Sequence, residues 1–565
     1  MTLLQPAFLF LFSAFACLLI ANDRLRAQLL LIVPLLSLLW VIFLPEGSHA
    51  NIEFVGLSLE FLRVDGLSKI FAIIFSIAAF LGGLYAWHVR DLMQQCATLA
   101  YAGSAIGGVF AGDLLTLFLY WELTAVTSVF LIWARRTEGA FHTGMRYLLI
   151  QVLSGVLLLM GLLLVYRDSG SIAFTAMTLG SLGTWCIFLA FGIKCAFPLL
   201  HNWLQDSYPA ATVTGTVILS AFTTKMAVYA LARGFPGTEI LIYIGAVMTL
   251  FPIFFAEIEN DLRKVLAYSL NNQLGFMVVG VGVGTPLALN GTAAHAFCHI
   301  LYKSLLFMSV GAVLYRTGTS KASELGGLYR TMPKTAVFCL IGAASISAVP
   351  LFSGFVSKSL ILSAAGKEGY WLVWGALLVA SAGVLSHSGI KIPYTAFFAK
   401  DCGKRPAEAP DHMLWAMGIT SALCVGIGIA PGALYALLPF DVTYHPYSFG
   451  HILTQLQLLG FALLAFVFLM KTGLHPHELR ALNVDSDWLY RKATPAVLGK
   501  FGKLYTRISK HVSTALQHSA TAVTSQLSRF SEPGGALARG WSINSMVFIL
   551  ILVMGLVLLF NFSKV

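Results

Sequence analysis

About sixteen apolar runs, most of them close to twenty residues long, limit the fold of this chain more than any other feature. A helix needs ~20 apolar residues to cross the hydrocarbon of a bilayer. The runs are continuous, whereas the strands of a membrane barrel would show short segments of alternating hydrophobicity. Only 11% of the residues are charged, against ~25% in a typical soluble domain. We therefore predict an all-α polytopic membrane protein, with about sixteen transmembrane helices near residues 3–21, 28–45, 66–88, 96–111, 114–134, 145–166, 176–200, 213–234, 238–256, 265–285, 290–316, 336–363, 370–397, 413–438, 451–470 and 543–562.

The first run, 3–21, is expected to remain in the mature chain as a helix. It lacks the basic segment that precedes the core of a signal peptide, and the polar residues Asn22, Asp23 and Arg24 follow it directly. Loop charges set the orientation, because Lys and Arg accumulate on the cytoplasmic side. With the N-terminus outside, fifteen Lys and Arg residues fall in inner loops and four in outer loops. Sixteen spans would return the C-terminus to the outside.

A polar segment, 471–542, lies between the last two runs and has the pattern of an amphipathic helix. Apolar residues recur in it mostly at three- and four-residue steps from Val497 to Phe530, and basic residues lie on the other faces. Such a helix would be ~50 Å long and too polar to span. A basic amphipathic helix lies along a membrane surface, so we expect a lateral helix on the cytoplasmic side. No soluble folded part presents the positive charge, which argues against a nucleic-acid partner.

The eight cysteines indicate buried thiols. No two of them form a CxxC pair, and most fall inside apolar runs. Iron–sulfur and zinc sites need clustered thiolates. We therefore expect no cofactor, no metal and no disulfide framework in this chain. Any redox centre would lie in another protein of the same complex.

Five ionisable side chains stand inside the apolar runs, namely Glu122, Lys194, Lys225, Lys303 and Lys358. A charge near the bilayer centre costs roughly 2.5–3.5 kcal/mol on insertion scales. Chains keep such groups where something charged must cross the membrane. This pattern predicts an ion or proton pathway.

Glu122 and Lys194 are predicted to act as a protonation switch. Pro198 follows Lys194 closely, removes a backbone hydrogen bond and should break the helix there. A broken helix at membrane depth is tolerated where it lines a cavity or is buried in protein. A lysine deprived of water gives up its proton more readily, and an approaching carboxylate makes it hold the proton. A static ion pair between the two residues is the alternative interpretation.

His295, His299 and Lys303 are spaced four residues apart, so they share one face of a helix. Histidine titrates near neutral pH, and such a stack can relay protons through water. Two other interpretations remain open. His-x3-His is a common spacing of metal ligands, although the Glu of an HExxH motif is absent. Histidines can also serve as hydrogen-bonding groups between helices.

The run near 336–363 resembles the run that contains Lys194. Pro350 and Gly354 precede Lys358 within an apolar stretch. Each of the two runs thus combines a disrupted helix with one lysine. Two interrupted helices in one chain point to an internal repeat, as in many transporters.

Six strings, taken together and in order, resemble the antiporter-type family of membrane subunits. This family includes the large membrane subunits of respiratory complex I, of membrane-bound hydrogenases and of Mrp-type multisubunit cation/proton antiporters. The six strings are Trp121 to Leu123, Gly192 to Leu204, Asp261 to Ser269, His299 to Phe307, Leu325 to Leu328, and Ser353 to Lys358. Two further strings, Ser386 to Tyr394 and Asp487 to Arg491, look most like the D-type subunit of Mrp antiporters.

The resemblance implies two inverted five-helix repeats, each with one broken helix. It also implies a proton pathway of seven side chains: Glu122 and Lys194 on the uptake side, Lys225, His295, His299 and Lys303 between the halves, and Lys358 on the release side. The chain would then divide into N-terminal transmembrane helices (1–95), a first repeat (96–256), a second repeat (257–400), further transmembrane helices (401–470), the lateral segment (471–542) and a last helix (543–565).

We expect a multi-pass subunit of a bacterial inner-membrane cation/proton antiporter, with Na⁺ as the cation and other membrane subunits as partners. It would be part of a transporter and not an enzyme, unless it belongs to an NADH:quinone oxidoreductase. Three alternatives remain: a proton-pumping subunit of a complex I-like or hydrogenase-like redox complex, a membrane subunit of an inorganic carbon uptake system, and a scaffold that transports nothing. The scaffold would leave the buried charges unexplained.

Overall fold

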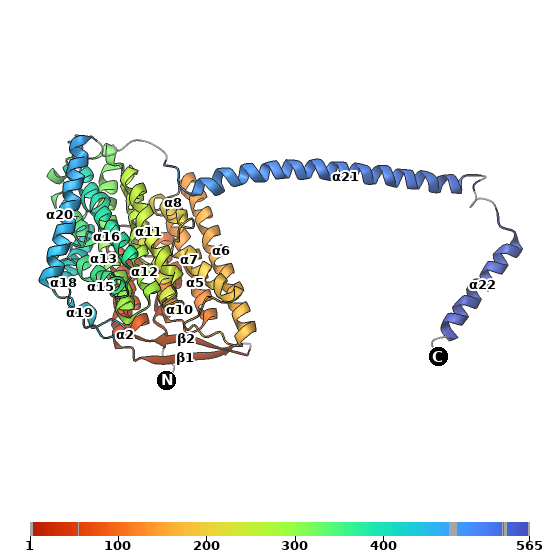
Figure 1. Cartoon of the computed structure of the whole chain (residues 1–565), viewed down its shortest axis with the longest axis horizontal. Coiled ribbons are helices and arrows are strands. Elements are labelled where there is room, and N and C mark those ends of the chain that lie inside the picture. The colour runs from red at the N-terminus through yellow and green to blue at the C-terminus, as the bar shows by residue number, and fades with distance from the viewer. Residues whose placement is uncertain (1–3, 55, 474–482, 534, 536–539, 563–565) are drawn as a thin grey trace. The chain divides into compact units, whose positions relative to one another are not determined.

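A computed structural model of the chain describes all residues except 1–3, 55, 474–482, 534, 536–539 and 563–565. The chain divides into two compact units, Met1–Asn483 and Val484–Val565. Helices dominate both units (Figure 1).

The described elements of the first unit are, in chain order, α1 (Pro6–Leu19), α2 (Asp23–Phe43), β1 (Gly47–Phe54), β2 (Leu57–Val64), α3 (Gly66–Tyr85), α4 (Leu92–Phe110), α5 (Leu114–Trp133), α6 (Glu138–Ser169), α7 (Leu182–Lys194), α8 (Asn202–Ala210), α9 (Val213–Ala221), α10 (Thr223–Gly234), α11 (Ile240–Ile258), α12 (Leu262–Val283), α13 (Pro286–Thr317), η1 (Ala322–Glu324), η2 (Leu328–Arg330), α14 (Pro333–Ile346), α15 (Ser353–Lys367), α16 (Trp371–Val384), η3 (Leu385–Ile390), α17 (Lys391–Pro393), η4 (Tyr394–Phe398), α18 (Asp411–Ile429), α19 (Gly432–Tyr435) and α20 (Phe449–Thr472). Those of the second unit are η5 (Leu489–Ala493), α21 (Thr494–Ser531) and α22 (Ile543–Phe562).

The predicted helical membrane class is confirmed. Within the described ranges, eleven helical stretches are long and apolar enough to cross a membrane, and α1, α7 and α14 are shorter apolar helices. The predicted number of sixteen continuous spans is not confirmed. Each predicted run contains a helix, but the runs 213–234, 336–363 and 370–397 are interrupted, so they do not form single regular helices.

A β-hairpin departs from the all-helical prediction. Strands β1 and β2 pair antiparallel from Gly47 opposite Val64 to Phe54 opposite Leu57. The backbone N–H of Glu60 in β2 donates to Asp113 Oδ2 at 2.8 Å. Asp113 also caps α5, the helix that carries Glu122. The hairpin is therefore tied to the beginning of a helix that bears a predicted site residue.

Helices α12 and α13 are enclosed by the rest of the first unit. In the most apolar 18-residue window of α13, 94% of the residues are buried, and almost all of α12 is buried as well. A helix that is apolar all round belongs in such a position. These two helices nevertheless carry polar side chains in the interior, among them Gln273, His295, His299 and Lys303.

The second unit contains the long helix that the polar segment predicts. The apolar stripe from Val497 to Phe530 falls within α21, whose 38 residues correspond to ~57 Å. α22 follows as a strongly apolar helix. The predicted amphipathic helix is therefore confirmed as a helix of about the predicted extent.

Candidate functional site

Lys194, the last residue of α7, directs its ammonium group at α5. Its Nζ donates hydrogen bonds to the carbonyl oxygen of Trp121 and, at 2.9 Å, to Thr124 Oγ1. It also lies 4.5 Å from the centre of the Trp121 ring. The residue is only 1% exposed. The bundle thus holds this lysine in its interior by means of neutral oxygen atoms and an aromatic ring.

Glu122 lies next to Trp121 on α5 but is not the group to which Lys194 donates. Glu122 Oε1 is buried and has no hydrogen-bond partner. The charges of Glu122 and Lys194 are nevertheless close enough to act on each other. The structure therefore does not show the static ion pair of the alternative interpretation. A near but unpaired carboxylate can form and release a contact with the ammonium, as a protonation switch requires.

The helix that carries Lys194 breaks as predicted. α7 ends at Lys194 and α8 begins at Asn202, with Pro198 between them. Ala196 and Leu199, on either side of Phe197 and Pro198, have positive φ angles of 61° and 68°. Residues other than glycine seldom adopt this left-handed conformation. The broken segment is thus a defined turn held by its surroundings.

The second break has the same backbone geometry. α14 ends at Ile346 and α15 begins at Ser353. Ala348 and Leu351 have φ angles of 56° and 74°. Both breaks have the sequence Ala-x-Pro-Leu, and in both the alanine and the leucine are the left-handed residues. An internal repeat would produce this correspondence.

Lys358 on α15 donates to a carbonyl at the end of α14. Its Nζ lies 2.7 Å from the carbonyl oxygen of Ile346 and 5.1 Å from the centre of the Phe276 ring. Lys358 is 1% exposed. The last carbonyl groups of a helix have no partner within that helix. The break therefore provides the acceptor that allows a lysine to be buried here.

A third break, which the sequence does not reveal, lies beside Lys225. α9 ends at Ala221 and α10 begins at Thr223. The Tyr101 hydroxyl accepts a hydrogen bond from the backbone N–H of Thr223 at 3.0 Å, and Lys225 Nζ donates to the carbonyl oxygen of Ser220 at 2.5 Å. No Pro or Gly marks this position, so the interruption depends on tertiary contacts.

His295 on α13 is engaged by two neighbouring side chains. Its Nδ1 lies 3.0 Å from Ser357 Oγ, and its Nε2 lies 3.3 Å from the Tyr302 hydroxyl, which donates to Gln273 Oε1 at 3.1 Å. For His295 the structure thus shows hydrogen bonding between helices. Among the described residues, no group of three His, Cys, Asp or Glu side chains could hold a metal ion. The described residues therefore offer no third ligand for a metal ion bound by His295 and His299.

His299 and Lys303 follow His295 along α13 and are fully buried. Neither ring nitrogen of His299 has a hydrogen-bond partner in the described structure, and Lys303 Nζ has none either. Buried polar groups of this kind are commonly satisfied by internal water. The face that the four-residue spacing predicts is therefore suited to a hydrated path.

The two halves of the predicted pathway meet at α13. Lys225 on α10 and Lys358 on α15 both act electrostatically on His295 and on Lys303. Lys225 also interacts with Cys195, beside the first break. The structure thus brings Lys225, Lys358 and the three α13 residues into one region, with Glu122 and Lys194 forming a second cluster next to it.

Several polar residues of this region were missing from the sequence prediction. Ser220, Tyr302 and Ser357 contact predicted residues directly, whereas Tyr101 and Gln273 contact Thr223 and Tyr302 beside them. One signal could have been found, because Asn271, Asn272 and Gln273 form a run of three amides within an apolar stretch. The single hydroxyl groups carry no such signal, since serine and threonine are frequent in membrane helices.

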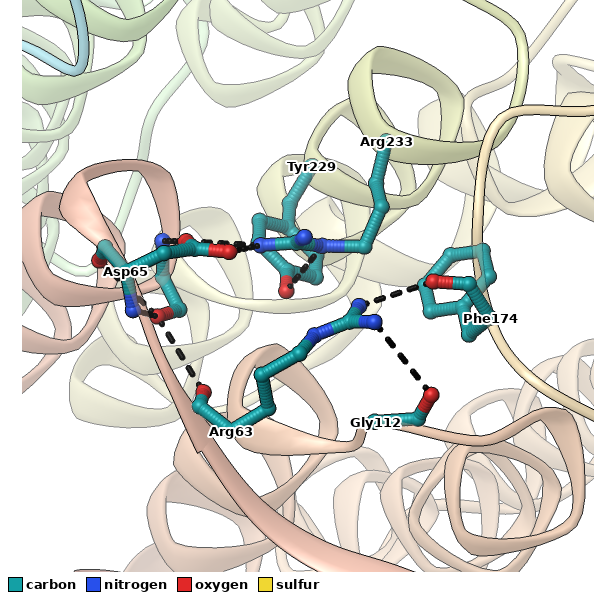
Figure 2. A network of polar contacts seen from close by, with 7 residues as sticks. Arg63, Asp65, Gly112, Phe174, Tyr229 and Arg233 are labelled. Atoms are coloured by element: carbon teal, nitrogen blue, oxygen red, sulfur yellow. Dashed lines mark hydrogen bonds and ion pairs between the residues drawn. The ribbon is translucent and has the colours of Figure 1, made fainter. Parts of the chain in front are cut away.

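An ionic network joins α10 to the beginning of α3 (Figure 2). Arg233 donates to both carboxylate oxygens of Asp65, at 2.8 and 2.7 Å, and to the Tyr229 hydroxyl at 2.7 Å. Arg63 donates to the carbonyl oxygen of Phe174 at 2.8 Å. Burial raises the pKa of Asp65, but Arg233, the backbone N–H of Ser68 and Arg63 together hold that pKa below its usual range. The network fixes the end of α10 that follows Lys225.

Residues 111–385 match the family described as NADH:quinone oxidoreductase/Mrp antiporter, TM. The matched segment contains both helix breaks with positive φ angles and all seven predicted site residues. The matched segment, just under half of the chain, belongs to this family. Its match to the NADH:quinone oxidoreductase/Mrp antiporter family agrees with the resemblance found in the sequence.

Curated relatives of this chain come from more than one kind of complex. It is 32% identical to the D component of the Na(+)/H(+) antiporter of Alkalihalophilus pseudofirmus, over 48% of this chain and 59% of that protein. It is 27% identical to hydrogenase-4 component B of Escherichia coli, over 75% of this chain and 71% of that protein. It is 28% identical to the A/B component of a probable K(+)/H(+) antiporter of Rhizobium meliloti, over 68% of this chain and 42% of that protein. The chain thus spans less than two thirds of two of these relatives.

Two solved structures share the fold of this chain. A chain of the Mrp complex from Dietzia superposes with a TM-score of 0.71 at 20% identity, over 82% of this chain and 98% of that chain. A chain of the membrane-bound sulfane sulfur reductase, an archaeal respiratory complex, superposes with a TM-score of 0.68 at 23% identity, over 76% of this chain and 95% of that chain. At these identities the likeness shows the fold.

Proposed function

We propose that this chain is the proton-translocating subunit of a multisubunit cation/proton antiporter of the Mrp type. The observation that carries the proposal is the series of buried basic side chains on α7, α10, α13 and α15. None of them is more than 1% exposed, and they are Lys194, Lys225, His295, His299, Lys303 and Lys358. An ionisable group inside a membrane costs free energy, and proteins retain such groups where they transport charge.

In this proposal a proton enters the series at Lys194 and leaves it at Lys358. Glu122 stabilises the protonated form of Lys194 when its carboxylate approaches, and Lys194 releases its proton when the carboxylate withdraws. A proton that reaches Lys225 raises the cost of a second proton on Lys303, because like charges repel in a medium of low dielectric constant. Each proton that arrives therefore favours the release of another proton further along the series. That proton moves through His295 and His299 or through water.

The cation path is assigned to a partner protein of the complex. Of the relatives described above, one is named as a component of a Na(+)/H(+) antiporter and one as a component of a probable K(+)/H(+) antiporter, and Na⁺ is the first cation to test. The described part of the chain offers no cluster of carboxylates that could hold a cation. Hard cations need several oxygen ligands. This chain would therefore move protons while a neighbour moves the cation.

The remaining features fit a bacterial inner-membrane complex. The excess of basic residues in the loops predicted as inner favours N- and C-termini outside. α21 would then lie on the cytoplasmic side, along neighbouring subunits or anionic lipid. The two broken helices would belong to two inverted repeats, 96–256 and 257–400. The transmembrane helices 1–95, the transmembrane helices 401–470, the lateral segment 471–542 and the last helix 543–565 would flank them.

A redox-driven pump is the second candidate, because one relative is a hydrogenase-4 component and one structural neighbour belongs to a respiratory reductase. The same series of lysines would serve both functions. The difference lies in the partners, since a redox complex needs iron–sulfur or flavin proteins that this chain does not provide.

Purification of the native complex through a tag on this chain, in mild detergent, tests the proposal. Mass spectrometry should identify several small membrane subunits and no cofactor-binding ones. The matched control is an unrelated polytopic protein with the same tag in the same membranes. Iron–sulfur or flavin partners, seen by mass spectrometry and by absorbance, would favour the redox pump and overturn the antiporter.

A further inference from the structure

The helix that begins at Trp371 changes its winding beside the pathway. α16 ends at Val384, and the chain continues through the π-helical turn η3, the short α17 and a second π-helical turn, η4. Such turns are rare and frequently mark functional sites. The first one places His387 and Ser388 in the interior, where both are 0% exposed.

Hydrogen bonds hold His387 as one tautomer. Ser388 Oγ donates to Ser269 Oγ on α12 at 2.8 Å, so a lone pair of Ser388 remains for His387 Nδ1, which is 2.8 Å away. The neutral ring then carries its proton on Nδ1, and Nε2 is an acceptor. Nε2 is buried and has no hydrogen-bond partner in the described structure. This atom can receive a proton from the interior.

Two of the three basic residues that act electrostatically on His387 belong to the pathway. They are Lys303 on α13 and Lys358 on α15, and the third is Lys391 on α17. Like charges disfavour two protons at once on neighbouring groups. His387 therefore takes a proton when Lys303 has released one. This arrangement suits a group that passes a proton on and does not store it.

Beyond the π-helical turn, polar groups continue to the end of α11. Ser386 Oγ donates to Glu257 Oε1 at 2.9 Å, and Lys391 Nζ donates to the carbonyl oxygens of Glu257 and Glu259 at 2.5 and 2.9 Å. Glu259 forms an ion pair at 3.1 Å with Lys264, whose side chain is 28% exposed. The polar groups thus reach the loop between α11 and α12, where Glu259 is buried and its partner Lys264, on α12, is partly exposed to solvent.

We propose that His387 is a further proton-carrying residue, which connects the Lys303 centre to the loop between α11 and α12. A proton from Lys303 Nζ reaches His387 Nε2 through water, and the Nδ1 proton leaves through the hydroxyl groups of Ser388 and Ser269 and then through water to the polar groups at the end of α11. The ring gains one proton and loses one, and a rotation of the ring restores the starting tautomer. The inference rests on the proposed function, because His387 needs a proton current to carry.

The test is Na⁺-driven proton movement in vesicles that contain the whole complex. His387→Gln keeps an amide donor toward Ser388 but cannot be protonated, so the maximal rate should fall by ~10-fold or more while the Na⁺ concentration at half-maximal rate stays unchanged. Ser388→Ala should lower the maximal rate several-fold and change its pH profile, because His387 loses its fixed tautomer. His142→Gln, at an exposed position of α6, is the matched control and should leave the rate unchanged.

A maximal rate of His387→Gln within about twofold of the unsubstituted complex would overturn the assignment. A second pair of results would also overturn it: Ser388→Ala keeps a normal pH profile, and the His387→Gln chain fails to assemble into the complex. Together these results would indicate that His387 has a structural role. Lys194→Ala separates this from the proposed function. If Lys194→Ala is inactive and His387→Gln is active, only the assignment of His387 fails; if both are active, the proposed pathway fails.

Discussion

Gly155 on α6 provides the space that the carboxylate of Glu122 on α5 occupies. A Cβ atom at position 155 would overlap Glu122 Oε1. The backbone of α6 is helical through this position, so the glycine is needed for space and not for an unusual φ angle. The position of the carboxylate that faces Lys194 is therefore set by the neighbouring helix.

Gly155→Ala should displace the Glu122 carboxylate and leave the fold intact, because alanine favours a helix and the end of a glutamate side chain can move. We expect proton transport to fall by ~10-fold or more, since small displacements of a reacting group have effects of this size. Transport in vesicles measures the effect. Gly139→Ala, on the same helix with open space around it, should transport normally. Equal activity of the two variants would show that the position of the carboxylate is unimportant.

Asp65→Asn should destabilise the complex through loss of the ion pair with Arg233. The Arg233 side chain is only 12% exposed, and a charged donor that loses its partner in such a position costs about 1–3 kcal/mol. Asparagine caps a helix about as well as aspartate does, so the cap on Ser68 at the beginning of α3 should persist. The melting temperature of the purified complex should fall, and Asp65→Ala should lower it further. An unchanged melting temperature in Asp65→Asn would show that the network in Figure 2 contributes nothing.

His88, in the loop after α3, should make the protein less stable in acid. Its Nδ1 lies 2.9 Å from His412 Nε2. Burial, together with His412 and Arg90, lowers the pKa of His88 from 6.5 to about 4. The unfolded chain therefore binds more protons than the folded chain between these values, and stability falls as the pH decreases from 6.5 toward 4.

His88→Asn removes the titrating group, so its melting temperature should decrease less than that of the unsubstituted complex over the same pH range. The measurement is a series of melting curves between pH 6.5 and 4. His142→Asn, at an exposed position, is the control and should show the full decrease. A His88→Asn complex that loses stability as steeply as the control would contradict this assignment.

The sequence predicts those parts of the site that depend on local chemistry. Pro198 and Pro350 mark the two helix breaks because proline cannot donate to the helical ladder. The spacing of His295, His299 and Lys303 predicts their common face because a helix repeats every 3.6 residues. These features follow from residue type and order alone.

The parts of the fold and of the site that the sequence does not predict depend on contacts between distant segments. The break at Phe222 has no proline or glycine and is accompanied by the hydrogen bond from Thr223 to Tyr101. The hairpin is too short for hydropathy to reveal, and it is tied to Asp113, far away in the sequence, by the backbone N–H of Glu60. The Lys194 ammonium points toward Trp121 and not toward Glu122, because packing determines the rotamer of this side chain. For the same reason His387 was not among the predicted site residues, although Ser386, His387 and Ser388 form a polar string in an apolar run.

Na⁺-driven proton movement in vesicles that contain the purified complex shows whether protons cross through the buried lysines. A Na⁺ gradient should move protons in the unsubstituted complex, and Lys194→Ala and Lys358→Ala should each abolish that movement while the complex still assembles. Full exchange in either variant would remove that lysine from the pathway, and full exchange in both would show that protons do not cross through these lysines.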